Sequence, residues 1–150
     1  MALVALAATA QELDGIRYRL VAAGSAESAA PTAQRMLGLL AQGNIDAAAA
    51  MSNAPERRRE VLGDYRKRVG DEQFKRIFGQ YATPPNRLVA EVAIGGRHLL
   101  VWDLAEAGHQ LAGQYFVREG ERFVLDDAPS DERSRLQRIL SAYRSGKIKP

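Results

Sequence analysis

Few residues of this 150-residue chain have types and spacing that could support catalysis or metal binding. Its two histidines, His98 and His109, form neither an HExxH nor a His-x-His arrangement. The chain has no cysteine, which excludes thiol nucleophiles, disulfides and thiolate zinc sites. It also lacks a phosphate-binding loop and the Gly-x-Ser-x-Gly turn of serine hydrolases. We therefore expect no bound metal and no cofactor.

Asp103 is the acidic residue best suited to a catalytic role. A two-residue hairpin turn at 95–96 places Asp103 on the same strand face as Leu99 and Val101. A carboxylate over an apolar pocket can act as a general base, here with His98 or Tyr115 nearby. An ordinary ion pair at the end of the sheet is the alternative, and such pairs often imitate catalytic sites.

Arginine-rich helical surfaces are the second candidate for a functional site. The formal net charge of +3 comes from 21 basic and 18 acidic residues, and basic side chains concentrate in segments 53–82 and 131–150. Neither segment shows a helix-turn-helix pattern or interleaved aromatic residues, so we expect no nucleic-acid partner. Exposed arginines suit a protein interface. The candidate binding residues are Arg57, Arg58, Arg66, Trp102, Arg135 and Arg138.

The order of hydrophobic patterns predicts an α+β fold, because helices precede a block of strands. The strands form a four-stranded antiparallel meander, preceded by an N-terminal strand and helices and followed by a C-terminal helix. The expected strands are 16–22, 88–94, 98–104, 110–118 and 122–126, the helices are 31–42, 45–51, 54–69, 72–81 and 131–144, and hairpin turns fall at 95–96 and 119–120.

Polar residues near helix starts predict how two helices begin. Asn53 and Glu56 have the spacing of a capping box for the helix at 54–69. The acidic pair at 126–127 precedes the last helix, whose N-terminal end favours negative charge.

Residues 1–10 resemble the end of a secretory signal peptide. An apolar stretch leads to Ala8, Thr9 and Ala10, a small-x-small cleavage pattern, but no charged region precedes it. The segment is therefore a signal remnant or an N-terminal extension, and residues 11–150 form a single α+β domain. Export would make the protein periplasmic or secreted. No stretch approaches the roughly 20 apolar residues of a membrane span.

Segment 31–51 combines a helix, a break at 43–46 and an alanine-rich second helix. It resembles the opening of nuclear-transport-factor-2-like (cystatin-like) domains, and the helices followed by an antiparallel meander fit the same cone-shaped fold over about residues 31–127. This resemblance implies a pocket beneath a curved sheet. Such families include isomerases, dehydratases and non-catalytic periplasmic modules, so the fold alone does not select a function.

The first hypothesis is a non-enzymatic exported binding module that recognises a protein partner, for example as an inhibitor or immunity-type protein. A homodimeric scaffold protein is a further alternative, favoured if the sheet face bearing Leu100, Trp102 and Leu104 is buried only between chains.

The rival hypothesis is a pocket protein that binds a small molecule or catalyses proton transfer with a pocket carboxylate. It requires a cavity of roughly 300 Å³ or more. On the predicted register, Leu99, Val101, Phe74 and Phe78 would line that cavity, with Asp103 inside.

Overall fold

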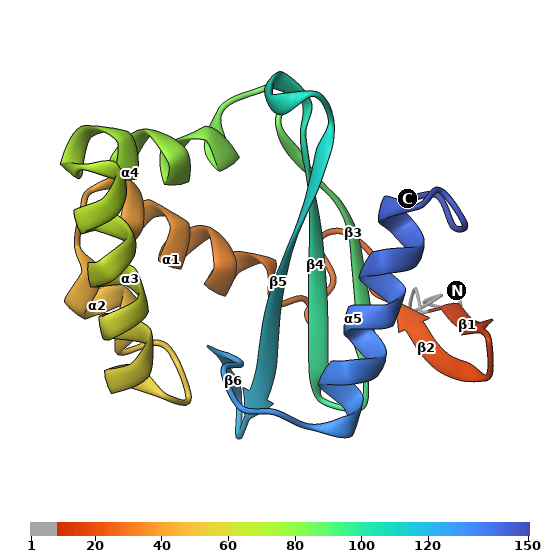
Figure 1. The fold of residues 1–150 in the computed structure, drawn as a ribbon. Coiled ribbons are helices and arrows are strands. Elements are labelled where there is room, and N and C mark those ends of the chain that lie inside the picture. The colour runs from red at the N-terminus through yellow and green to blue at the C-terminus, as the bar shows by residue number, and fades with distance from the viewer. Residues whose placement is uncertain (1–8) are drawn as a thin grey trace, which may run out of the picture.

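The computed structural model describes residues 9–150 and places one antiparallel sheet between two helical layers (Figure 1). Each strand pairs with its neighbour in the sequence, so the sheet order follows the chain. Figure 1 shows α1 to α4 on one face of the sheet and α5 on the other. The strands are β1 (Thr9–Leu13), β2 (Ile16–Leu20), β3 (Arg87–Ile94), β4 (Arg97–Leu104), β5 (Gln110–Glu119) and β6 (Arg122–Leu125). The helices are α1 (Ala30–Ala41), α2 (Ile45–Ala49), α3 (Pro55–Val69), α4 (Asp71–Gly79) and α5 (Asp131–Arg144), with short 3-10 turns η1 (Gln80–Ala82) and η2 (Ala105–Ala107).

The α+β class, the antiparallel sheet and the C-terminal helix are confirmed, but the sheet has six strands instead of a four-stranded meander. β1 was not expected, because its residues were assigned to the signal-like segment and its junction. Asp14 and Gly15 both have positive φ, 50° and 82°, which is the turn geometry that joins β1 to β2. β2 then extends the meander through two register pairs with β3. Residues 1–8 of the signal-like segment lie outside the described residues.

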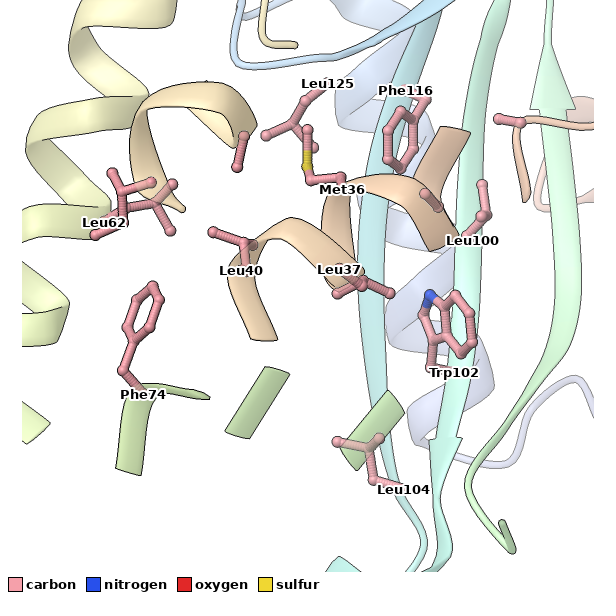
Figure 2. Close-up of a cluster of buried hydrophobic side chains, with 14 residues drawn as sticks. Met36, Leu37, Leu40, Leu62, Phe74, Leu100, Trp102, Leu104, Phe116 and Leu125 are labelled. Atoms are coloured by element: carbon pink, nitrogen blue, oxygen red, sulfur yellow. The ribbon is translucent and has the colours of Figure 1, made fainter. Parts of the chain in front are cut away.

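The larger core lies between α1–α4 and one face of the sheet. β4 contributes Leu100, Trp102 and Leu104 to this face, because every second residue of a strand points to the same side. Figure 2 shows these side chains facing Met36, Leu37 and Leu40 of α1, with Leu62 and Phe74 farther from the sheet. This face is therefore covered within one chain, which removes the argument for a homodimeric scaffold.

The second core lies on the opposite face of the sheet, under α5. Leu99 and Val101 of β4 pack there against Leu136, Ile139 and Leu140 of α5. The C-terminal helix thus covers the second apolar face that the strand pattern predicted. In the part of the chain that the structure describes, no helix is long and apolar enough to span a membrane.

A β-bulge in β3 changes one predicted face. Leu88 pairs with Trp102 and Ala90 with Val101, so Val89 is the extra residue. Leu88 consequently packs with Trp102 in the α1–α4 core, whereas uninterrupted alternation from the 95–96 turn predicts that Leu88 lies on the face of Leu99, Val101 and Asp103. A bulge leaves no clear sequence signal here, because Val89 is itself apolar.

The β5–β6 hairpin has a register two residues away from the predicted one. The turn consists of Gly120, with φ 65°, and Glu121, so Glu119 pairs with Arg122 and Phe116 pairs with Leu125. The prediction of a turn at 119–120 was wrong because it placed the glycine at the second turn position instead of the first.

Side-chain caps form at two helices, and the capping box predicted for α3 does not form. The side chains of Asn44 and Ser130 accept hydrogen bonds from backbone N–H groups at the starts of α2 and α5. At α3 the N-cap is Ala54, which has no side-chain cap. Asn53 is instead bonded to the two aspartates that follow β6, so a long-range contact replaces the predicted capping box.

Candidate functional site

An apolar space lies between α1, α4, η1 and the ends of β3 and β4. Its volume is about 470 Å³. Trp102 and Leu88 line it from the sheet, and Phe78 and Tyr81 line it from α4 and η1. The remaining lining residues are Gln34, Leu37, Gly38, Ala41, Gly79, Ala82, Asn86 and Arg87.

Small residues on the helices leave this cavity open. Gly38 is an ordinary helical glycine of α1, and a Cβ built on it would meet no atom within 4 Å. Gly79 at the end of α4 permits a close approach, since its Cβ would lie 3.8 Å from the Ala41 Cβ. A larger side chain at Gly38 would therefore project into space that the fold leaves unfilled.

Two aromatic rings form the sheet end of the cavity. Tyr81 packs edge to face on Trp102, with ring centroids 5.4 Å apart. The Trp102 indole N–H donates to the Gln114 Oε1 at 2.8 Å, which fixes the ring plane. Burial raises the pKa of the Tyr81 hydroxyl, with a smaller contribution from Tyr65, so this hydroxyl stays protonated at neutral pH.

Asn86 forms part of the polar side of the cavity. Its side chain is buried; the amide nitrogen donates to the Gln80 carbonyl at 2.9 Å, and Oδ1 accepts from the Glu106 N–H at 3.2 Å. These bonds connect η1, the start of β3 and η2. Gln34 and Arg87 are exposed residues of the same lining.

Asp103 and His98 do not come together. They are five residues apart on β4 and therefore point to opposite faces of the sheet. Asp103 pairs with the exposed His109, whose Nδ1 lies 3.2 Å from both carboxylate oxygens. Asp103 does not line the cavity at Trp102, and the predicted cavity between Leu99, Val101, Phe74 and Phe78 is not formed, because the first two side chains belong to the α5 core.

His98 belongs to a buried polar cluster centred on Glu91. The Glu91 carboxylate accepts from the Ser28 hydroxyl at 2.5 Å and from the Ala29 N–H at 2.8 Å. His98 Nδ1 lies 2.7 Å from Glu91 Oε2, the oxygen that also accepts from the Ala29 N–H, whereas Ser28 bonds to Oε1. Because the serine donates to the carboxylate and not to the imidazole, this is not a nucleophile–base arrangement. The cluster connects the start of α1 to the sheet, and the sequence did not predict it because Ser28 lies 63 residues before Glu91 in the chain.

The acidic pair after β6 is a second buried polar cluster. Asp126 accepts from Arg97 at 2.5 Å, while Asp127 accepts from the Ser52 hydroxyl and from the Nε and Nη2 of Arg58. Both aspartates are buried. Their main partners are thus arginine side chains, and the predicted interaction with the N-terminal end of α5 is not the principal one.

The predicted binding residues do not form one continuous surface. Trp102 is only 4% exposed and lines the apolar cavity. Arg58 is held by Asp127, and Arg66 lies 3.5 Å from Asp71. Arg57 on α3 and two arginines of α5, Arg135 and Arg138, are exposed.

Comparisons with known proteins identify no family for this chain. Nothing matches this chain among protein-family models, curated proteins or solved structures. The resemblance to nuclear-transport-factor-2-like domains therefore remains a prediction from the sequence. Within residues 9–150, no group of three or more metal-ligating side chains is arranged to hold an ion.

Proposed function

We propose that this domain binds a small, largely apolar molecule in the cavity beside Trp102. The observation that carries the proposal is the cavity itself. Its 470 Å³ falls within the range of about 300–1,000 Å³ that is typical of small-molecule sites. Its lining also has the usual character of such sites, with aromatic and aliphatic walls and a few polar side chains.

Binding without catalysis agrees best with the lining chemistry. No carboxylate and no imidazole belongs to the lining, so the pocket has no general base of the usual kind. The polar groups available are those of Gln34, Asn86 and Arg87, together with the protonated Tyr81 hydroxyl. They suit a ligand with an apolar body and one polar end.

Trp102 provides a direct test because it is the only tryptophan of the chain. Titration with the apolar fluorophore N-phenyl-1-naphthylamine should quench Trp102 emission saturably, through energy transfer to the bound probe. Gly38→Leu should reduce probe affinity at least tenfold, because its side chain fills the cavity. Its fold should be retained, since leucine is a better helix former than glycine by roughly 0.5–1 kcal/mol.

Gly63→Leu is the matched control, because Gly63 is also a helical glycine with no atom near its Cβ position but lies on α3, outside the cavity. It should bind the probe like the unmodified protein. Equal probe affinity in the Gly38→Leu and Gly63→Leu variants, or linear quenching without saturation, would contradict the proposal.

Export is proposed on the sequence pattern alone. Ala10 lies in β1 opposite Arg19, so cleavage after Ala10 would remove two of the five β1 residues. Mass spectrometry of the protein from the periplasm of a Gram-negative host would identify the mature N-terminus. Recovery of only unprocessed protein in the cytosol would argue against export.

Recognition of a protein partner, including an inhibitor or immunity-type role, needs a surface other than this cavity. Arg58 and Arg133 lie beside β5 and supply such a surface. The edge of the sheet next to these arginines indicates which kind of partner could bind there.

A further inference from the structure

The first half of β5 is an open sheet edge. β6 pairs only with residues 116–119, whereas β5 begins at Gln110, so residues 110–115 have no strand on the side away from β4 within the described chain. Proteins usually protect such edges with charged residues, proline or a bulge. Residues 110–115 are Gln, Leu, Ala, Gly, Gln and Tyr, without charge or proline, and their pairing with β4 is regular.

Hydrogen bonds at both ends of this edge show which backbone groups face outward. The Leu111 carbonyl accepts from Arg144 Nε at 2.9 Å, and the Tyr115 carbonyl accepts from the Asp126 N–H at 2.8 Å. Residues two apart on a strand direct their backbone groups to the same side. Gly113 therefore presents its N–H and C=O outward, and neither group bonds to a side chain or loop within residues 9–150.

A pocket of about 150 Å³ lies directly beside this edge. Gly113, Gln114 and Tyr115 form one side of it, and apolar side chains that include Met36 and Leu62 form the other. A peptide strand added to β5 would thus have room for a side chain that points toward α1 and α3.

Arginines border the same pocket and extend it. Arg58 and Arg133 line both the edge pocket and a neighbouring one of about 240 Å³, to which Arg57 also contributes. Asp127 is the only carboxylate of that second pocket, and Arg58 already binds it with two nitrogens. Three guanidinium groups therefore face one carboxylate, which leaves an excess of positive charge.

Arg133 has a buried N–H group without a hydrogen-bond partner in the described part of the chain. Its Nε is buried and has no hydrogen-bond partner among residues 9–150, and its guanidinium lies over the Tyr115 ring at 5.2 Å. A buried N–H without a partner is uncommon in folded proteins, and arginine binds carboxylates through paired N–H groups.

We propose that the open edge of β5 binds an extended acidic peptide segment of a partner protein. The segment adds a strand through the outward N–H and C=O of Gly113 and places a carboxylate against Arg57 and Arg133. Backbone pairing supplies affinity in this mode of recognition, and the adjoining pockets supply specificity. An extended peptide is favoured over a free anion because the arginines border an unpaired strand edge. Phe78 lines both the edge pocket and the cavity beside Trp102, but the strand edge at Gly113 and the side chains of Arg57 and Arg133 belong to the peptide site alone.

Selection from a phage-displayed library of random heptapeptides on the immobilised protein tests the proposal. The selected peptides should be rich in Asp or Glu and in β-branched residues. Arg57→Gln combined with Arg133→Gln should weaken the best peptide at least tenfold. The matched control is Arg135→Gln with Arg138→Gln, which removes two exposed arginines of α5 and should leave peptide affinity unchanged.

Hydrogen exchange of the Gly113 amide distinguishes strand addition from simple charge attraction. The bound peptide should slow this exchange at least tenfold, and N-methylation of alternate peptide residues should abolish binding. If the double variant fails to fold, Arg57→Gln alone serves, since Arg57 is exposed. The proposal is overturned by a library without enrichment, by selected peptides that bind the double variant equally well, by unchanged Gly113 exchange, or by saturable binding of inorganic phosphate alone.

Discussion

Asp127 shows how a buried residue can remain charged when its neighbours outweigh its burial. Burial raises the pKa of this carboxyl, but hydrogen bonds from Arg58 and Ser52 and the charges of Arg58 and Arg133 together hold it below its ordinary value. Asp127 therefore connects α3, through Arg58, and Ser52, which lies shortly before α3, to the chain after β6.

The lowered pKa of Asp127 predicts a stability that depends on pH. A folded-state pKa below the unfolded value of about 3.9 stabilises the fold above that pH, and this contribution is lost as the pH falls through the folded value. Asp127→Asn should lower the free energy of unfolding by about 2–3 kcal/mol at pH 7, because Arg58 loses its charged partner. Urea denaturation should show this difference shrinking below about pH 4.

Asp64→Asn provides the control for this measurement. Asp64 is exposed on α3, so its substitution should change stability by no more than about 0.5 kcal/mol. If Asp127→Asn had an equally small effect at pH 7, the ion pair with Arg58 would not stabilise the fold.

At the scale of single elements, the close packing of α5 on the sheet requires a glycine at position 113 of β5. A Cβ on Gly113 would lie 2.5 Å from Leu140 Cδ2 and 3.2 Å from Leu99 Cδ1. α5 packs on the sheet at this point, so the helix can approach only because the strand has no side chain there.

Gly113→Ala should therefore destabilise the fold by about 1–3 kcal/mol, as measured by urea denaturation, because the added methyl group overpacks the α5 core. The same substitution in a Leu140→Ala background should cost less, since the two positions share the space. Gly63→Ala on α3 should instead stabilise the protein by roughly 0.5–1 kcal/mol. Additive effects of the Gly113 and Leu140 substitutions would show that the contact does not limit the packing of α5.

The α5 core also predicts alkaline sensitivity. Burial, with a smaller contribution from Tyr18, raises the pKa of the Tyr143 hydroxyl to about 12. The folded state thus retains a proton that the unfolded chain loses near pH 10, so this stabilisation is complete below about pH 10 and is lost as the pH rises toward 12. Urea denaturation at pH 8, 10 and 11 should show falling stability, with a shallower fall in Tyr143→Phe. If the free energy of unfolding fell equally with pH in both proteins, groups other than Tyr143 would cause the loss of stability at alkaline pH.

At the scale of the whole molecule, one sheet has both of its apolar faces covered by its own helices. α1–α4 cover the face of Leu100 and Trp102, and α5 covers the face of Leu99 and Val101. Among the described residues, Val61 is the one large hydrophobic side chain that is strongly exposed, at 48%. The described surface therefore offers no extensive apolar patch for self-association.

We expect a monomer in solution. Sedimentation velocity should give one species with the mass of a single chain, independent of protein concentration across the micromolar range. A dimer that grows with concentration would contradict this expectation and would return attention to the homodimeric scaffold.

Local sequence patterns determined most elements of this protein, with β1 as the exception. The Phe74 to Tyr81 spacing predicted α4, the glycines at 95–96 placed Ile94 opposite Arg97, and alternation in β4 identified two apolar faces. These features depend on residues close in the chain, where side-chain periodicity and turn preferences act directly.

Only the tertiary structure decided which distant residues meet. It placed His98 with Glu91 and Ser28, Asp103 with His109, and Trp102 in a cavity rather than on a binding surface. Such contacts depend on the bulge in β3, on the two-residue shift of the β5–β6 hairpin and on how helices pack over a sheet. A bulge or a register shift costs little locally, yet it changes the face or the partner of a side chain. For that reason the sequence predicted the layers of this fold but not its sites.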